Sequence, residues 1–150
     1  MHLPQHPFGT AITLQLIAER LQKSPHWEDR YRELIRLSRQ MPLLPEVLRS
    51  RENEIYGCEN RVWVASEQDE HGGLHFVLES ESRIVKGLLA ILLSQCEGQQ
   101  PQTLVETDLL APFSELGLSQ HLSATRNSGL GAVAEAIKNA ANAALKDSQP

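Results

Sequence analysis

The sequence predicts a single α+β domain spanning residues 1–150, in which a small antiparallel sheet of about three strands packs against several helices. Residues 53–79 alternate apolar and polar positions in short segments, as half-buried strands do, whereas the flanking segments repeat their apolar residues at helical spacing. Residues 80–97 form the longest apolar helix candidate. A short run of strands between helices is typical of the α+β class.

Two amphipathic helices are expected before the sheet. A threonine, Thr10 or Thr13, can cap a first helix that continues to about Lys23. Ser24 and a proline follow, a pair that favours the N-cap and first position of a second helix, which we expect to end near Gln40. The charged face of this second helix is interpreted as solvated.

The strands follow a proline-rich break at residues 41–45 and a short helical turn at 46–50. We expect the strands themselves at 53–56, 61–67 and 74–79. A His-Gly-Gly sequence supplies the turn between the second and third strands.

The remainder of the chain is predicted to be helical. The helix at 80–97 is apolar on more than one side, so it should be central and packed on the sheet, and Gly98 should end it. Prolines and a glycine break residues 99–122 into short pieces. A last helix is expected over 128–145.

Charge and composition exclude several classes of function. The net charge is -5 with only 14 Lys and Arg, which argues against direct binding to nucleic acid. The chain has neither the start of a signal peptide nor an apolar run of the ~20 residues that a membrane span requires. Two cysteines 38 positions apart form no disulfide framework and no metal motif. We expect a cytoplasmic protein that binds no membrane and no metal.

Cys58 is the sulfur with a case for chemistry. A glycine precedes it, and two polar residues typical of turns follow before a strand begins, so the thiol should sit at a bend. The other cysteine, Cys96, lies in the apolar helix and is interpreted as a core residue. The alternative for Cys58 is a partly buried small residue in a strand turn.

Four stretches in order along the chain resemble the SufE/CsdE family of sulfur-acceptor proteins, with most similarity to its CsdE branch. They read HPFGT at 6–10, YGCENRVW at 56–63, RIVKGLLA at 83–90 and ATRNSGL at 124–130. Together they span nearly the whole chain. The resemblance implies a fold similar to that of iron-sulfur scaffold proteins.

The resemblance also implies an activity. A sulfur acceptor binds a cysteine desulfurase, accepts persulfide sulfur on the matching cysteine, here Cys58, and stimulates the desulfurase. It then relays the sulfur to a downstream recipient, either iron-sulfur cluster assembly or a tRNA-modifying enzyme. Such a protein is a sulfur carrier without independent turnover, and it has no cofactor of its own because pyridoxal phosphate belongs to the desulfurase.

Several residues around the cysteine are candidates for partner binding or for supporting the thiol: Gly57, Glu59, Asn60, Arg61, Trp63 and Arg126. Glu59 should raise the pKa of the thiol, whereas Arg61 and the backbone amides of the turn could lower it. The family resemblance implies that apolar residues enclose the free cysteine, and Tyr56 and Trp63 are the expected walls. Arg126 either lies near Cys58 or contacts the partner, or it is a solvated arginine at a helix start.

Two other functions stay open. An iron-sulfur scaffold would need several converging thiolate or imidazole ligands, and Cys58 has no cysteine companion near it in sequence. A docking module would activate the desulfurase without carrying sulfur. We assign no ligand role to the histidines, since a Gly-Gly pair separates His71 from His75 and His121 has no partner at a recognised spacing.

Overall fold

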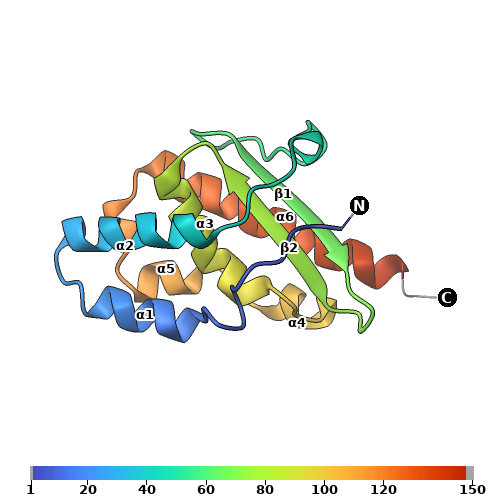
Figure 1. The fold of residues 1–150 in the computed structure, drawn as a ribbon, viewed down its shortest axis with the longest axis horizontal. Helices are drawn as coiled ribbons and strands as arrows, with labels where there is room; N and C mark the ends of the chain where they lie inside the picture. Colours follow the sequence, from blue (N-terminus) through green and yellow to red (C-terminus); the bar gives the residue numbers. More distant parts are fainter. Residues whose placement is uncertain (1, 148–150) are drawn as a thin grey trace.

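The computed structural model describes residues 2–147. Figure 1 shows helices gathered around a long two-stranded ribbon. In chain order the elements are α1 (Leu14–Gln22), α2 (Trp27–Gln40), the 3-10 turn η1 (Glu46–Leu48), β1 (Val62–Gln68), β2 (Leu74–Ser80), α3 (Arg83–Cys96), α4 (Pro101–Glu106), α5 (Ala111–Glu115), the 3-10 turn η2 (Ser119–His121) and α6 (Ala124–Asp147).

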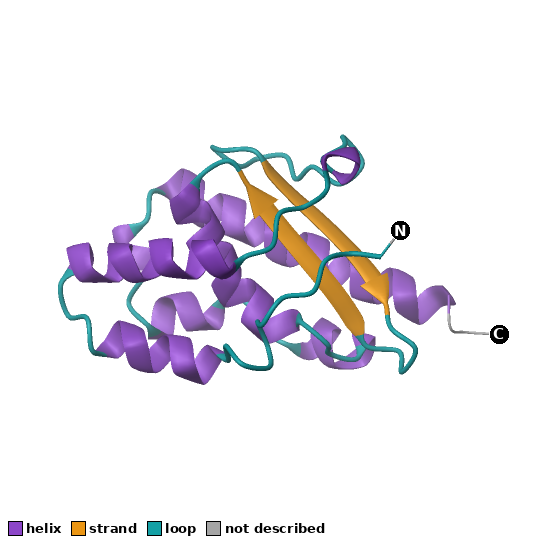
Figure 2. Ribbon diagram, viewed as in Figure 1, coloured by secondary structure: helices purple, strands orange, loops and turns teal. Residues whose placement is uncertain are grey.

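The sheet is an antiparallel hairpin, visible as the two arrows in Figure 2. Its register runs from Val62 paired with Ser80 to Gln68 paired with Leu74. At the turn, the Asp69 carboxylate accepts the backbone N–H groups of His71 and Gly73, at 2.8 and 2.9 Å. This side chain fixes the turn that the His-Gly-Gly sequence predicts.

Helix α3 is the centre of the core, as its apolar sequence predicts. All residues from Leu88 to Leu93 are at most 1% exposed. The helix contacts β2, α2, α1 and α6, so it has neighbours on every side. A helix that is apolar all round is stable in water only when it is enclosed in this way.

The prediction of a third strand at 53–56 is wrong. Among the described residues this segment makes one isolated bridge, Glu54 to Trp63, with hydrogen bonds of 2.8 Å on either side of it. Pairing stops there because Gly57 has a φ of 94°, a left-handed conformation that turns the chain away from the sheet. The α+β class holds with two strands.

The predicted helix starts are correct at one position and shifted at others. Thr13 caps α1 by accepting the Leu16 N–H at 3.2 Å. Ser24 does not cap α2, which begins at Trp27, because its hydroxyl donates to the carbonyl of Arg20 and closes α1 instead. The last helix begins at Ala124 rather than at residue 128, since Ser123 accepts the Arg126 N–H at 3.1 Å.

The outer face of the sheet is covered by two chain segments. Residues 3–8, named here the N-terminal strap, cross β2, and residues 44–48 lie beside them (Figure 1). These segments enclose a second small apolar cluster, formed by Leu3, Leu44, Leu48, Trp63, Ala65 and Val77. The sheet therefore has apolar residues on both faces.

Across residues 2–147, we find no helix with the length and apolar character needed to cross a membrane.

Packing between α2 and α3 depends on Gly87. A Cβ added there would lie 2.7 Å from the carbonyl carbon of Leu34 and 2.8 Å from its Cβ. We expect Gly87→Ala to lower the free energy of unfolding by about 1–3 kcal/mol, because the two helices must separate. Urea denaturation measures the change.

The matched control is Gly131→Ala on α6, where the nearest atom to an added Cβ is 4.0 Å away. Its effect should be neutral or stabilising by up to about 1 kcal/mol, from helix propensity alone. Equal effects of the two substitutions would contradict the assignment of Gly87 as a close-packing position.

Candidate functional site

Cys58 sits on the turn that leads into β1. Gly57 supplies the left-handed backbone conformation immediately before it, so glycine at this position orients the thiol. Cys58 lies beside a turn and a bend, in agreement with the position predicted from sequence. Its side chain is half-buried and is not in a disulfide.

The thiol points at the start of α6. Its Sγ lies 3.7 Å from the carbonyl oxygen of Gly129, to which the S–H donates a weak hydrogen bond. A Cβ added at Gly129 would lie 3.3 Å from the sulfur, which is a tight contact. The absence of a side chain at Gly129 therefore lets α6 approach the cysteine.

A small pocket surrounds the sulfur at the seam between β1, α3 and α6. Glu59, Asn60, Thr125 and Arg126 form its polar part. The rest of the lining is apolar: Val62, Val85, Leu88, Leu89, Leu130 and Val133. No histidine and no second cysteine occurs among the described residues that line it.

The apolar surroundings decide the protonation state of the thiol. Burial raises the pKa of Cys58 above its ordinary value. Arg61 does not offset this effect, because its guanidinium binds Glu54 at 2.9 Å and stacks on the Trp63 ring at 4.8 Å. The resting cysteine is therefore a protonated thiol at neutral pH.

The prediction that Tyr56 and Trp63 enclose Cys58 is wrong. Tyr56 is 68% exposed, and Trp63 is buried in the cluster on the outer face of the sheet. The alternation of β1 is the reason: Val62 points into the pocket, so its neighbour points to the opposite face. Trp63 instead lies beneath two arginines, Arg49 at 6.0 Å and Arg61.

Arg126 lies near Cys58, one of the alternatives considered from sequence, and it is not the solvated arginine of the other. Its backbone N–H takes part in the cap made by Ser123 at the start of α6. Its side chain lines the Cys58 pocket, and the Nε atom is buried with no hydrogen-bond partner among the described residues. A guanidinium with an unused donor beside a thiol can interact with a negative charge formed there.

Cys96 is a core residue, as predicted. It is 0% exposed, and burial raises the pKa of its thiol well above the ordinary value. A buried and protonated thiol of this kind is chemically inert.

The structure also brings together three residues that sequence spacing does not connect. His6, His75 and Glu97 meet at the edge of β2, with one possible ligand atom from each lying within 4.8 Å of the others. They come from the strap, from β2 and from the end of α3, and no spacing in the sequence signals their contact. They lie apart from the residues that line the Cys58 pocket.

Comparison with known proteins relates the chain to one family. The profile of SufE, the Fe-S metabolism associated domain, matches residues 15–141. The sulfur acceptor protein CsdE of Escherichia coli (strain K12) is 48% identical over 132 residues, covering 88% of this chain and 90% of that protein. An uncharacterized SufE-like protein of Rhizobium meliloti (strain 1021) is 39% identical over 122 residues, covering 79% and 87%.

The contact between Cys58 and Gly129 predicts how accessible the thiol is. Gly129→Ala should push the sulfur outward by a few tenths of an ångström, reduce its burial and lower its pKa. We expect faster alkylation by iodoacetamide, by about tenfold for each unit that the pKa falls, because the thiolate is the reactive form. The pH dependence of the alkylation rate measures both quantities.

Gly131→Ala, on the same helix but away from the sulfur, should leave the rate unchanged. Cys96 serves as an internal reference, since it should stay unmodified in the folded protein. An unchanged rate in Gly129→Ala would show that α6 does not restrain the thiol.

Proposed function

The chain belongs to the SufE family, and we propose that it is a sulfur-acceptor protein that docks on a cysteine desulfurase and accepts persulfide sulfur on Cys58. The observation that carries the proposal is the placement of this thiol: it lies on a surface turn, in an apolar pocket, without a second cysteine or a histidine among the described pocket residues. Such a site suits the carriage of sulfur better than acid-base catalysis.

The transfer is a displacement at sulfur. The Cys58 thiolate attacks the outer sulfur of the persulfide on the donor cysteine. The sulfur-sulfur bond of the donor breaks, a new one forms on Cys58, and the donor cysteine leaves as a thiolate. No net oxidation occurs, and the chain needs no cofactor for this step. Pyridoxal phosphate would be the cofactor of the desulfurase.

Docking must change the surroundings of the thiol before the reaction. In the resting state burial keeps the thiol protonated, and Gly129 covers the sulfur from one side. Gly57, which has a left-handed backbone conformation, can act as the hinge when the turn that carries Cys58 moves outward. The same pocket would shelter the persulfide from solvent once the turn returns.

Arg126 is proposed as the residue that supports the charged forms of Cys58. The persulfide and the thiolate are anionic, and the pocket supplies one guanidinium with a buried, unused donor. Glu59 and Asn60 form part of the polar rim of the pocket. Arg61 does not line the pocket, but its side chain, paired with Glu54, is 55% exposed and available for contact with the partner.

The alternatives are less well supported. Assembly of a cluster needs several converging ligands, and the described pocket offers one thiol. A docking module that does not transfer sulfur would work without the Cys58 sulfur. The experiment below therefore distinguishes a docking module from a sulfur acceptor. We also propose that the protein passes the sulfur on to iron-sulfur cluster assembly or to a tRNA-modifying enzyme.

Cys58→Ser should separate docking from transfer. The hydroxyl is close in size but far less acidic, so it cannot act as the nucleophile. We expect the variant to keep most of its affinity for the desulfurase by calorimetry, to gain no mass of ~32 Da per sulfur after incubation with the desulfurase and cysteine, and to lose stimulation of turnover.

Cys96→Ala is the matched control, since it removes the other cysteine from the core and should transfer sulfur normally. Full stimulation by Cys58→Ser would identify a docking module instead of an acceptor.

Arg126→Met tests the charge beside the thiol. Methionine keeps a flexible apolar stem and removes the guanidinium. We expect slower sulfur acceptance at unchanged affinity, with the deficit reduced at high pH where the thiolate forms without help. Rapid-quench mass spectrometry measures the rate, and an unchanged rate at neutral pH would limit Arg126 to its backbone cap.

A further inference from the structure

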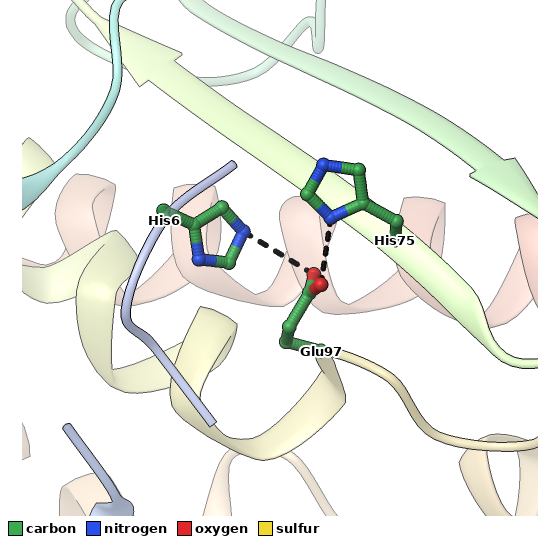
Figure 3. A group of neighbouring side chains, drawn as sticks. All are labelled: His6, His75 and Glu97. Carbon is green, nitrogen blue, oxygen red and sulfur yellow. Dashed lines mark hydrogen bonds and ion pairs between the residues drawn. The ribbon is translucent and has the colours of Figure 1, made fainter. Parts of the chain in front are cut away.

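The N-terminal strap is joined to β2 by three ionisable residues (Figure 3). Glu97 caps the end of α3, and its Oε2 lies 2.6 Å from Nδ1 of His75. Its Oε1 accepts the backbone N–H of Phe76 at 2.8 Å and lies 3.2 Å from Nε2 of His6. The carboxylate therefore contacts β2 and the strap together.

The hydrogen bonds of His75 determine its protonation. Its Nδ1 faces the Glu97 carboxylate, and its Nε2 lies 2.9 Å from the carbonyl oxygen of Pro4 in the strap. Carboxylate and carbonyl oxygens only accept hydrogen bonds, so both ring nitrogens must donate. A ring with two N–H groups is the imidazolium cation.

His6 has the complementary arrangement. Its Nδ1 accepts the Phe8 N–H at 3.3 Å, and its Nε2 donates to the Phe76 carbonyl oxygen at 2.8 Å. This ring is therefore neutral, with its proton on Nε2. It stacks on the His75 ring, with the centroids 5.2 Å apart.

A divalent metal is the other candidate for this cluster, because the three ligand atoms lie within 4.8 Å of one another. Coordination by His6 would require an unprotonated Nε2. That nitrogen would then face the Phe76 carbonyl oxygen at 2.8 Å with no proton between them. A proton on Nε2 satisfies the contact with Phe76, and a bound metal would break it.

We propose that His6, His75 and Glu97 form a proton-operated clasp: the imidazolium of His75, held between Glu97 and the Pro4 carbonyl, fastens the N-terminal strap to β2, and loss of its proton loosens the strap.

The charges around the clasp agree with this assignment. Glu97 faces His75 from the end of α3, Glu67 acts on it from β1, and His6 stacks on it from the strap. Burial lowers the pKa of His75, but the hydrogen bond and charge of Glu97 outweigh burial and leave it above its ordinary value of 6.5. Burial raises the pKa of Glu97, but the nearby His6 ring, the Phe76 N–H and the hydrogen-bonded His75 outweigh burial and leave it below its ordinary value of 4.5.

The signs of these shifts define the pH range in which the clasp is closed. A raised histidine pKa contributes stability that is complete below 6.5 and is lost as the pH rises through the folded value. The lowered pKa of Glu97 contributes stability above 4.5 that is lost as the pH falls through its folded value. The clasp is therefore strongest from 4.5 to 6.5, and it opens as the pH rises through the folded pKa of His75.

Opening changes what the protein exposes. Leu3 of the strap is 6% exposed and packs in the outer-face cluster with Trp63 and Val77. The strap is held there also by Glu67, which accepts the Leu3 N–H at 3.0 Å. A loosened strap uncovers apolar surface on the side of the sheet opposite the Cys58 pocket.

Two measurements on the unmodified protein test the clasp. Nitrogen-detected NMR of the imidazoles should show His75 with both nitrogens protonated at pH 6, and its titration midpoint should lie above 6.5. The hydrogen-exchange protection of the Leu3 and Phe8 amides should fall as His75 titrates. The total fall is about tenfold for each unit by which the His75 pKa differs between the closed and open strap.

The amide of Val77, which pairs with Ala65 in the sheet, is the reference and should show no such step. A neutral His75 at pH 6, or strap protection that is independent of pH from 6 to 9, would overturn the proposal. Stoichiometric binding of Zn²⁺ that shifts both histidines would also overturn it and identify a metal site.

Glu97→Gln supplies a variant test, because the amide keeps the shape but not the charge. The titration midpoint of His75 should fall, and the pH step in strap protection should shrink. His71→Gln, at the exposed hairpin turn, is the matched control and should change neither. If Glu97→Gln does not fold, the measurements on the unmodified protein decide the question alone.

Discussion

The burial of α3 on all sides between Leu88 and Leu93 is the constraint on which the rest of the structure depends. A helix with apolar residues on every side needs cover on every side, and a two-stranded sheet can supply only one of these contacts. Helices α1, α2 and α6 supply others. Close approach then requires small residues at the crossings, which is why Gly87 lies against the backbone of Leu34.

The same packing produces the site. Val85, Leu88 and Leu89 on α3 belong to the core, and they also line the pocket of Cys58. The thiol thus lies at the edge of the core, where α6 approaches through Gly129. Desolvation there makes the resting thiol a poor nucleophile. A sulfur carrier gains from this arrangement, because a persulfide formed on docking would return to a partly enclosed, mostly apolar pocket.

Polar side chains take the place of a neighbouring strand at the free edge of β2. Along the free edge of β2, Glu97 accepts the Phe76 N–H and His6 donates to the Phe76 carbonyl, as a neighbouring strand would do. Glu79, only 2% exposed, accepts the Leu44 N–H and binds Lys86 at 3.1 Å. Buried charges are tolerated when they are paired in this way, and they fix the covering segments in place.

The sequence by itself determined the α+β class, the long apolar helix, a threonine cap at residue 10 or 13, and the placement of Cys58 at a turn and of Cys96 in the core. Each of these depends on local periodicity or on turn chemistry, which short segments of the chain carry. Tertiary structure alone decided the contacts between distant segments. These include the partner of Cys58 at Gly129, the placement of Trp63 on the outer face and the meeting of His6 with His75 and Glu97. The physical reason is that such contacts depend on which faces the packing of α3 turns toward one another, and residue spacing does not encode this.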